Sequence, residues 1–168
     1  MSFFSRLVDP KALPPYKKSL PILSPVSGRV FTLDNVPDAL FTQRIYGEGV
    51  AIEPSGYQIF APFSGKVEQF PESAHQLRIV AKNGLKMQIQ MGINSHRMMG
   101  EGFKRKVKVG ELFKQGQVLA EFDLRKMKLA LDCTLCPVTI INSDKIAGIQ
   151  AHCYQVIATE DHAMTVYI

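Results

Sequence analysis

The sequence lacks any apolar run approaching the length of about 20 residues that a membrane-spanning helix needs. Its N-terminus also lacks the apolar region of a secretory signal peptide. Cysteine is scarce: the chain has three, an odd number, which argues against a secreted fold held by disulfides. These absences favour a cytoplasmic protein.

Aromatic residues do not interleave with basic ones, as they do in stacking platforms for nucleic acids. The formal net charge is +5, and the only dense basic cluster is residues 104–108, Lys-Arg-Lys-Val-Lys. We interpret this cluster as a solvated loop and expect no nucleic-acid partner.

At 168 residues, with 46% hydrophobic and 21% charged residues, the chain suits one domain with a substantial core. Residues 1–20 contain Pro10, Pro14 and Pro15 and are predicted to be a flexible N-terminal tail. Residues 21–168 form the predicted domain.

Beyond the tail, short strand-like segments alternate with turn signals, which predicts an all-β fold, an antiparallel β-sandwich or barrel. Residues 24–30 and 61–67 are near copies, each with the pattern x-Pro-x-Ser-Gly-basic-Val. This internal repeat predicts two similar β-units packed face to face, with the Pro-x-Ser-Gly turns at equivalent corners.

Helical patterns are scarce, and we expect one or two short helices. One covers about two turns within residues 123–131, and single turns are predicted near residues 35–38 and 142–144.

Cys133, Cys136, His152 and Cys153 are potential zinc ligands. Adjacent residues of a strand point to opposite faces, so His152 and Cys153 are poorly placed to bind one ion. The Cys-x-x-Cys pair runs into a strand instead of opening a helix as a redox motif does. We interpret these cysteines as buried or half-buried core residues and expect no metal.

The most informative stretch is a predicted β-hairpin with strands at residues 75–80 and 85–91, joined by the Asn-Gly turn of residues 81–84. Its second strand alternates apolar residues with Lys and Gln, which fits a half-buried strand. The start of one strand lies beside the end of the other, so His75 and Gln90 should be neighbours on an apolar surface. An imidazole there is a candidate for chemistry, although a lone histidine is more often structural.

The hairpin and its flanks resemble one protein family. The matching segments are residues 72–79, Gly84 and residues 90–95, where the family pattern ends in His-Phe-Gly-Ile-Asp-Thr. Further matches, almost without gaps, are residues 36–38, Phe41, and residues 47–52, 61–62, 100–105, 109–110, 121–124, 134–135 and 137–138. The chain is similar to the glucose-type enzyme IIA of the bacterial phosphoenolpyruvate-dependent sugar phosphotransferase system.

The resemblance implies that His75 accepts a phosphoryl group from phospho-HPr and passes it to a sugar-permease IIB domain. No cofactor is implied beyond this covalent phosphoryl group. Ser73 matches the hydroxyl residue that hydrogen-bonds the His75 ring and leaves its other nitrogen free to react. Asp38 would pair with a basic residue of HPr at the edge of an apolar docking rim. The rim would comprise Phe41, Ile45, Tyr46, Phe70, Met91 and Ile93.

Three positions depart from the family pattern: Gln90 replaces the second active-site histidine, Asn94 an aspartate and Ser95 a threonine. Glutamine keeps an N–H donor for a phosphoryl oxygen, but it cannot become cationic. The loss of one well-aimed charged donor costs on the order of 10²–10³ in rate. We therefore expect loading from HPr to survive better than onward transfer. Asn94 should weaken docking to a basic partner by about 0.2–1 kcal/mol.

His96 is a candidate replacement for the missing imidazole, although we favour a solvent-exposed loop histidine at this position. In the family, the two histidines also ligate zinc when a partner adds a carboxylate. Gln90 removes that two-imidazole chelate, so the zinc site is not expected here.

The tail also resembles that of family members, which rests on lipid. Phe3, Phe4, Leu7 and Val8 would share one side of a short helical turn, with Arg6 and Lys11 nearby, and make weak membrane contact. A disordered end is the favoured alternative.

Two other functions compete with the transport carrier. Residues 107–119 and the Met127-Lys128 pair look like a biotinyl or lipoyl domain, whose attachment lysine sits on a hairpin tip. That likeness covers a quarter of the chain, and the pair falls in the predicted helix.

A regulatory paralogue is the second alternative. It would bind target proteins according to the phosphorylation state of His75, and Gln90 favours it.

Overall fold

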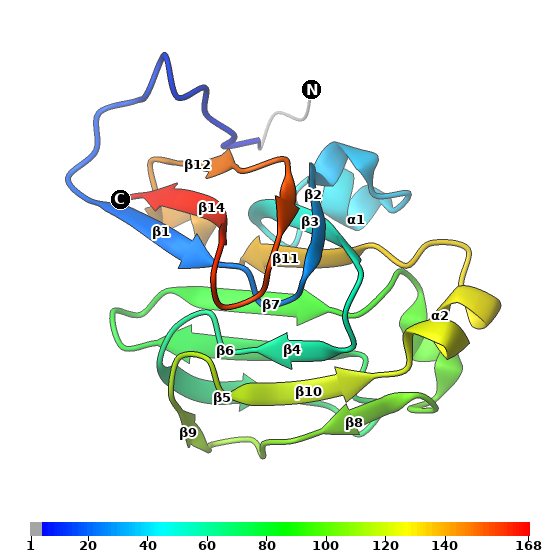
Figure 1. The fold of residues 1–168 in the computed structure, drawn as a ribbon. Helices are drawn as coiled ribbons and strands as arrows, with labels where there is room; N and C mark the ends of the chain where they lie inside the picture. The colour runs from blue at the N-terminus through cyan, green and yellow to red at the C-terminus, as the bar shows by residue number, and fades with distance from the viewer. Residues whose placement is uncertain (1–4) are drawn as a thin grey trace.

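The computed structural model describes residues 5–168, and strands predominate in it (Figure 1). Phe3 and Phe4 of the predicted tail lie outside the described residues. The strands are β1 (Ser19–Leu23), β2 (Gly28–Thr32), β3 (Glu48–Pro54), β4 (Gln58–Phe60), β5 (Gly65–Gln69), β6 (Gln76–Ala81), β7 (Lys86–Gln90), β8 (Phe103–Arg105), β9 (Leu112–Phe113), β10 (Val118–Phe122), β11 (Cys136–Ile140), β12 (Gly148–Ala151), β13 (Gln155–Val156) and β14 (His162–Tyr167). The helices are α1 (Ala39–Thr42) and α2 (Leu124–Ala130), with single 3-10 turns η1 (Leu33–Asn35), η2 (Ser95–Met98) and η3 (Ser143–Lys145).

The strands form one eight-stranded sheet and two three-stranded sheets. The large sheet has the order β13-β2-β3-β11-β7-β6-β5-β9, and the small ones are β1-β14-β12 and β4-β10-β8. In Figure 1 the two small sheets lie at the top and the bottom of the molecule. The prediction of an all-β, antiparallel sandwich with one or two short helices is confirmed, and the described sheets do not close into a barrel.

The sheet order is symmetric about the ladder between β7 and β11. The series β9-β5-β6-β7 mirrors β13-β2-β3-β11, and β4-β10-β8 mirrors β1-β14-β12. One unit, β4 to β10, is therefore inserted between β3 and β11 of the other. The units are joined edge to edge through the β7–β11 ladder, and not packed face to face as the repeat predicted.

The serines of the repeat make equivalent contacts in the two units. Ser27 Oγ accepts a hydrogen bond from the backbone N–H of Ala158 at 2.9 Å, and Ser64 Oγ accepts one from that of Gln115 at 3.0 Å. Each serine thus ties its turn to the loop that precedes the central strand of its small sheet, so the repeated segments have the same role in the two units.

Most apolar residues gather in one core between the sheets, which includes Met87, Ile89 and Met91 of the predicted half-buried strand. A second cluster lies under η1 and α1, where Leu33 and Phe41 are buried. The helix predicted within residues 123–131 is α2. It begins at Asp123, whose carboxylate accepts from the Lys126 N–H at 3.0 Å, and it buries Met127.

Lys126 and Lys128 lie in α2, and Met127 between them is buried. A biotinyl or lipoyl attachment site needs its lysine on a hairpin tip, so this arrangement argues against that alternative. Within residues 5–168, no helix has the length and apolar character to cross a bilayer.

The tail is attached to the domain near its start. Leu7 forms a parallel bridge with Ile149 of β12, where the Val8 N–H donates to the Ile149 carbonyl at 2.9 Å and the Ile149 N–H to the Arg6 carbonyl at 2.9 Å. Leu7 and Val8 are therefore in an extended segment and not in the predicted helical turn, because the open edge of β12 supplies backbone partners. β1 begins at Ser19, two residues before the predicted domain boundary.

We predict that Gly65→Ala destabilises the fold, because a Cβ at this position would overlap the Val80 carbonyl oxygen in the β5–β6 ladder. The expected loss is about 1–3 kcal/mol of unfolding free energy, measured by urea denaturation. Gly56→Ala is the matched control, since its Cβ would come no closer than 3.8 Å to Ser27 Cβ. It should change stability by less than about 0.5 kcal/mol. Equal stability of the two variants would contradict the prediction.

Candidate functional site

The start of β6 lies beside the end of β7, as the sequence predicted. Gln76 is paired with Gln90, and the Met91 N–H donates to the His75 carbonyl at 2.8 Å. Ala74, in the left-handed region with φ 54°, turns the chain immediately before His75. The position of the imidazole is therefore set by the first residue pair of a regular ladder and by a strained turn.

Ser73 holds the His75 ring, since its Oγ lies 2.7 Å from His75 Nδ1. If Nδ1 carries the proton and donates to this hydroxyl oxygen, Nε2 has the free lone pair of a nucleophile. The ring is half-buried. Burial, with a smaller contribution from the nearby His96, lowers the pKa of His75 and so favours its neutral, nucleophilic form.

The His96 ring lies near that of His75. Its ring centroid lies 6.1 Å from that of His75, with the ring planes at 64°. His96 is exposed on η2, and the residues flanking this turn, Asn94 and Met99, are both in the left-handed region. The loop returns at Gly100, where an added Cβ would lie 3.6 Å from the Glu72 carbonyl oxygen, and so it packs against the turn that precedes His75.

Gln90 is buried, and its side chain is directed to the η2 loop. Its Nε2 donates to the Gly92 carbonyl at 2.9 Å, and Ser95 Oγ donates to the same carbonyl at 3.1 Å. One of the two amide N–H groups is thus engaged by the loop backbone. Two of the family departures, Gln90 and Ser95, therefore share one acceptor.

Four residues of the predicted docking rim are buried. Phe41, Phe70, Met91 and Ile93 are at most 3% exposed. Phe70 and Met91 belong to the main core, and Phe41 and Ile93 to the cluster beneath η1 and α1. Their apolar character reflects packing, so they support the surface from below and do not form an exposed rim.

The other two residues of the predicted rim, Ile45 and Tyr46, do reach the surface. Ile45 is 60% exposed, and Tyr46 is half-buried against Phe41, with ring centroids 5.2 Å apart. Met99, which directly follows η2, is 88% exposed, and Leu129 of α2 is 83% exposed. Sequence analysis missed Met99 and Leu129, because an apolar residue in a loop or a short helix gives no signal of its exposure.

Two hollows flank Arg97 on this surface. One of about 430 Å³ lies toward α2 and is lined by Met99 and Leu129 among others. The other, of about 150 Å³, is lined by Pro37 and Asn94 among others. An uneven apolar and polar surface thus extends from the segment before α1, past the η2 loop, to α2.

The Asp38 side chain is held in a helix cap, whereas the Asn94 side chain is exposed. Asp38 caps α1, where its Oδ1 accepts a hydrogen bond from the Leu40 N–H at 2.9 Å. The other carboxylate oxygen takes no part in this cap. Asn94 is exposed, and its left-handed conformation with φ 57° is one that asparagine tolerates well.

A buried ion-pair network anchors the α1 segment. Glu48 accepts from Arg44 Nε at 3.2 Å and from the Arg6 N–H at 2.7 Å, and Arg44 Nη1 donates to Asp34 at 2.7 Å. Burial would lower the pKa of Arg44, but the hydrogen bond and charge of Asp34 and the charge of Glu48 raise it overall. Sequence analysis missed this network, for which a glutamate between two glycines was the only signal.

The cysteines are only partly as predicted. Cys136 is fully buried, which raises the pKa of its thiol to about 12, and Cys133 is half-buried. Cys153 is exposed, in contrast to the prediction. Among the described residues, no group of three or more His, Cys, Asp or Glu side chains is placed to hold a metal ion.

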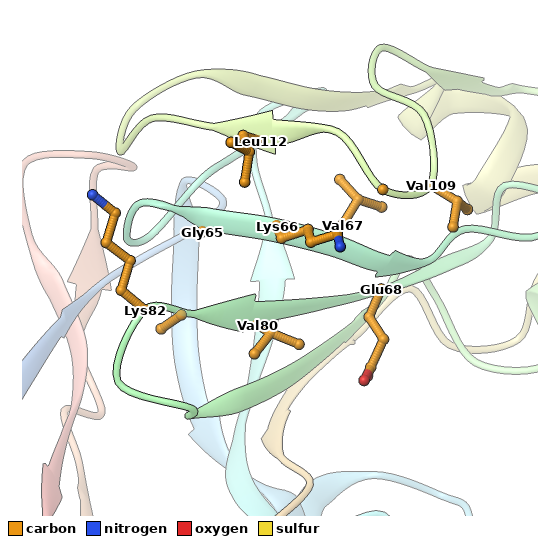
Figure 2. A pocket seen from close by; sticks show the side chains of 10 residues that line it. Gly65, Lys66, Val67, Glu68, Val80, Lys82, Val109 and Leu112 are labelled. Atoms are coloured by element: carbon orange, nitrogen blue, oxygen red, sulfur yellow. The ribbon is translucent and has the colours of Figure 1, made fainter.

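A separate groove of about 510 Å³ lies over β5 and β6 (Figure 2). Exposed Val109 and Leu112 border it, and Lys82 and Glu68 lie toward its two ends. Neither His75 nor Ser73 lines this groove. It is therefore distinct from the histidine site.

Comparison with known proteins gives consistent results. The model of a family described as phosphoenolpyruvate-dependent sugar phosphotransferase system, EIIA 1, matches residues 20–146. The glucose-specific EIIA component of Buchnera aphidicola is 31% identical over 167 residues, covering 99% of both chains. That of Borreliella burgdorferi is 34% identical over 137 residues, covering 80% of this chain and 72% of its own. Glucose permease IIA from Mycoplasma capricolum superposes with a TM-score of 0.80 at 27% identity, covering 88% and 96%.

We predict that His96→Gln raises the pKa of His75, because it removes a positive charge that disfavours the protonated His75 ring. Burial, the larger cause, is unchanged, so the pKa of His75 should stay below its ordinary value. NMR titration of the His75 ring protons measures the shift. The control is His162→Gln, at an exposed histidine of β14. An unchanged His75 titration in His96→Gln would contradict the prediction.

Proposed function

Because the chain belongs to the EIIA 1 family of the phosphoenolpyruvate-dependent sugar phosphotransferase system, we propose that His75 carries its phosphoryl group. The protein is a phosphoryl carrier of that system, a phosphotransferase component that holds the group covalently and uses no other cofactor. Its family interacts with HPr and with sugar-permease IIB domains. The observation that carries the assignment to His75 is the 2.7 Å contact of its Nδ1 with Ser73, which leaves Nε2 free.

In the proposed transfer, the lone pair of His75 Nε2 forms the new N–P bond. The electron pair of the broken P–N bond returns to the nitrogen of the donor histidine, so no proton has to move. The His75 ring gains positive charge as the bond forms, and Ser73 Oγ, accepting from Nδ1–H, stabilises it. The rest of the rate acceleration comes from alignment of the two nitrogens and from exclusion of water by the docked partner.

We assign docking to the surface around the site. Ile45 and Tyr46 provide apolar contact, the second oxygen of Asp38 pairs with a basic residue of HPr, and Asn94 offers an uncharged polar contact. Buried Phe41, Phe70, Met91 and Ile93 keep this surface rigid. The relatives are named glucose-specific, which supports a glucose-type permease as the acceptor.

Two finer proposals stay predictions. Binding of regulated target proteins would use the same surface, and a phosphoryl group on His75 would alter its charge. Weak membrane contact by the tail would depend on Phe3 and Phe4, since Leu7 and Val8 lie against β12.

We expect the protein to gain one phosphoryl group when it is incubated with phosphoenolpyruvate, enzyme I and HPr. Peptide mass spectrometry under alkaline conditions should locate the group on His75. His75→Gln should abolish the label, whereas His162→Gln should retain it. A protein that stays unlabelled, or a label that persists in His75→Gln, would refute the assignment. Lipoylation or avidin binding without this label would favour the prosthetic-group carrier instead.

Ser73→Ala should slow loading by a factor between about two and ten, corresponding to one hydrogen bond worth 0.5–1.5 kcal/mol. Without its acceptor, the Nδ1 proton no longer fixes Nε2 as the nucleophile. Ser73→Thr keeps the hydroxyl and is the control. Stopped-flow transfer from phospho-HPr measures both rates, and a Ser73→Ala rate equal to that of the native protein would remove Ser73 from the mechanism.

A further inference from the structure

We propose that His96 supplies the second imidazole of the phosphoryl site, where its protonated ring donates a hydrogen bond to an oxygen of the phosphoryl group on His75. This inference rests on the proposed function of His75. It extends that function by naming the cationic group that Gln90 cannot provide.

The first support is geometric. The two rings are close, with centroids 6.1 Å apart, yet no hydrogen bond joins them among the contacts of residues 5–168. The ring planes are inclined at 64°. At this separation, an oxygen on phospho-His75 would be within reach of the His96 ring and would accept the charge-assisted hydrogen bond, typically about 2.7–2.9 Å long.

The second support is the fixing of the loop that carries His96. Gln90 Nε2 and Ser95 Oγ both donate to the Gly92 carbonyl at the start of this loop. An added Cβ at Gly92 would collide with the Leu131 side chain, so the loop also sits closely on the end of α2. The residue that replaces an imidazole therefore helps to position another one, and we assign Gln90 a positioning role.

The third support is electrostatic. The His96 ring is exposed to water, where a positive charge has little desolvation cost. His75, in contrast, is half-buried, and burial lowers its pKa, which favours the neutral form that attacks phosphorus. The other charged groups on the elements that meet here are Glu72, Arg97, Glu101 with its partner Lys126 at 3.5 Å, and Arg105, which donates to the Phe70 carbonyl.

His96 does not transfer a proton in this scheme. It neutralises charge on the equatorial oxygens while the P–N bond to one histidine forms and the bond to the other breaks. Onward transfer is then retained despite Gln90, in contrast to the expectation from the sequence alone.

The test uses the full-length protein, phosphorylated on His75, with unphosphorylated HPr as the acceptor in rapid-quench assays. His96→Gln should lower the transfer rate by about 10- to 100-fold near neutral pH, less than in an enclosed oxyanion hole because the ring lies at the surface. His96→Lys keeps a cation and should recover much of the rate, with a flat profile between pH 6 and 8. His162→Gln, at an exposed histidine of β14, is the control and should behave as the native protein does.

A partner-free measurement separates a contact with the phosphoryl group from a docking role. In the native phosphoprotein, the ³¹P resonance and the His96 ring protons should shift with pH together, and His96→Gln should move the ³¹P inflection. Native-like transfer and ³¹P titration in His96→Gln would overturn the inference, while His75 labelling would still uphold the carrier function. Absence of label on native His75 would refute both.

Discussion

The hydrogen bond between Ser73 and His75 is the interaction on which the proposed chemistry depends. In that proposal it selects the reactive nitrogen, and the left-handed turn at Ala74 and the first pair of the β6–β7 ladder bring the two side chains together. Pairing of β7 with β11 fixes this hairpin in the large sheet, so the position of the Ser73–His75 contact depends on the sheet as a whole. Positioning of this kind is most of what phosphoryl transfer asks of a protein.

The fold was largely predictable from local signals. Alternation of apolar and polar residues identified the hairpin, Asp123 marked the start of α2, and the repeated Pro-x-Ser-Gly turn revealed two units. The way in which these units join was not predictable, because edge pairing and face packing bury similar apolar residues. Attachment of the tail to β12 was missed as well, since backbone pairing at an open sheet edge requires no side-chain pattern.

The candidate site was predictable in its centre and not in its surroundings. The hairpin register, which follows from the turn, pairs Gln90 with Gln76, the residue after His75, and Ser73 contacts the His75 ring. Exposure depends on which distant segments cover a residue, so Phe41 and Ile93 under α1 and η1 proved to be core residues. His96 was considered an ordinary loop histidine, because its distance from His75 is set by the fold of the η2 loop and by contacts with Gly92 and α2.

The nesting of one unit inside the other has a consequence for how the chain is made. The inserted unit, β4 to β10, is continuous in sequence, so all its strands are present once Phe122 has been synthesised. The outer unit must wait, since β11 pairs with β3, and β14 with β1 across almost the whole chain. Such long loops close slowly. The unit that carries His75 is thus the one that can organise first during translation, and its β7 edge stays open until β11 in the last quarter of the chain has been synthesised.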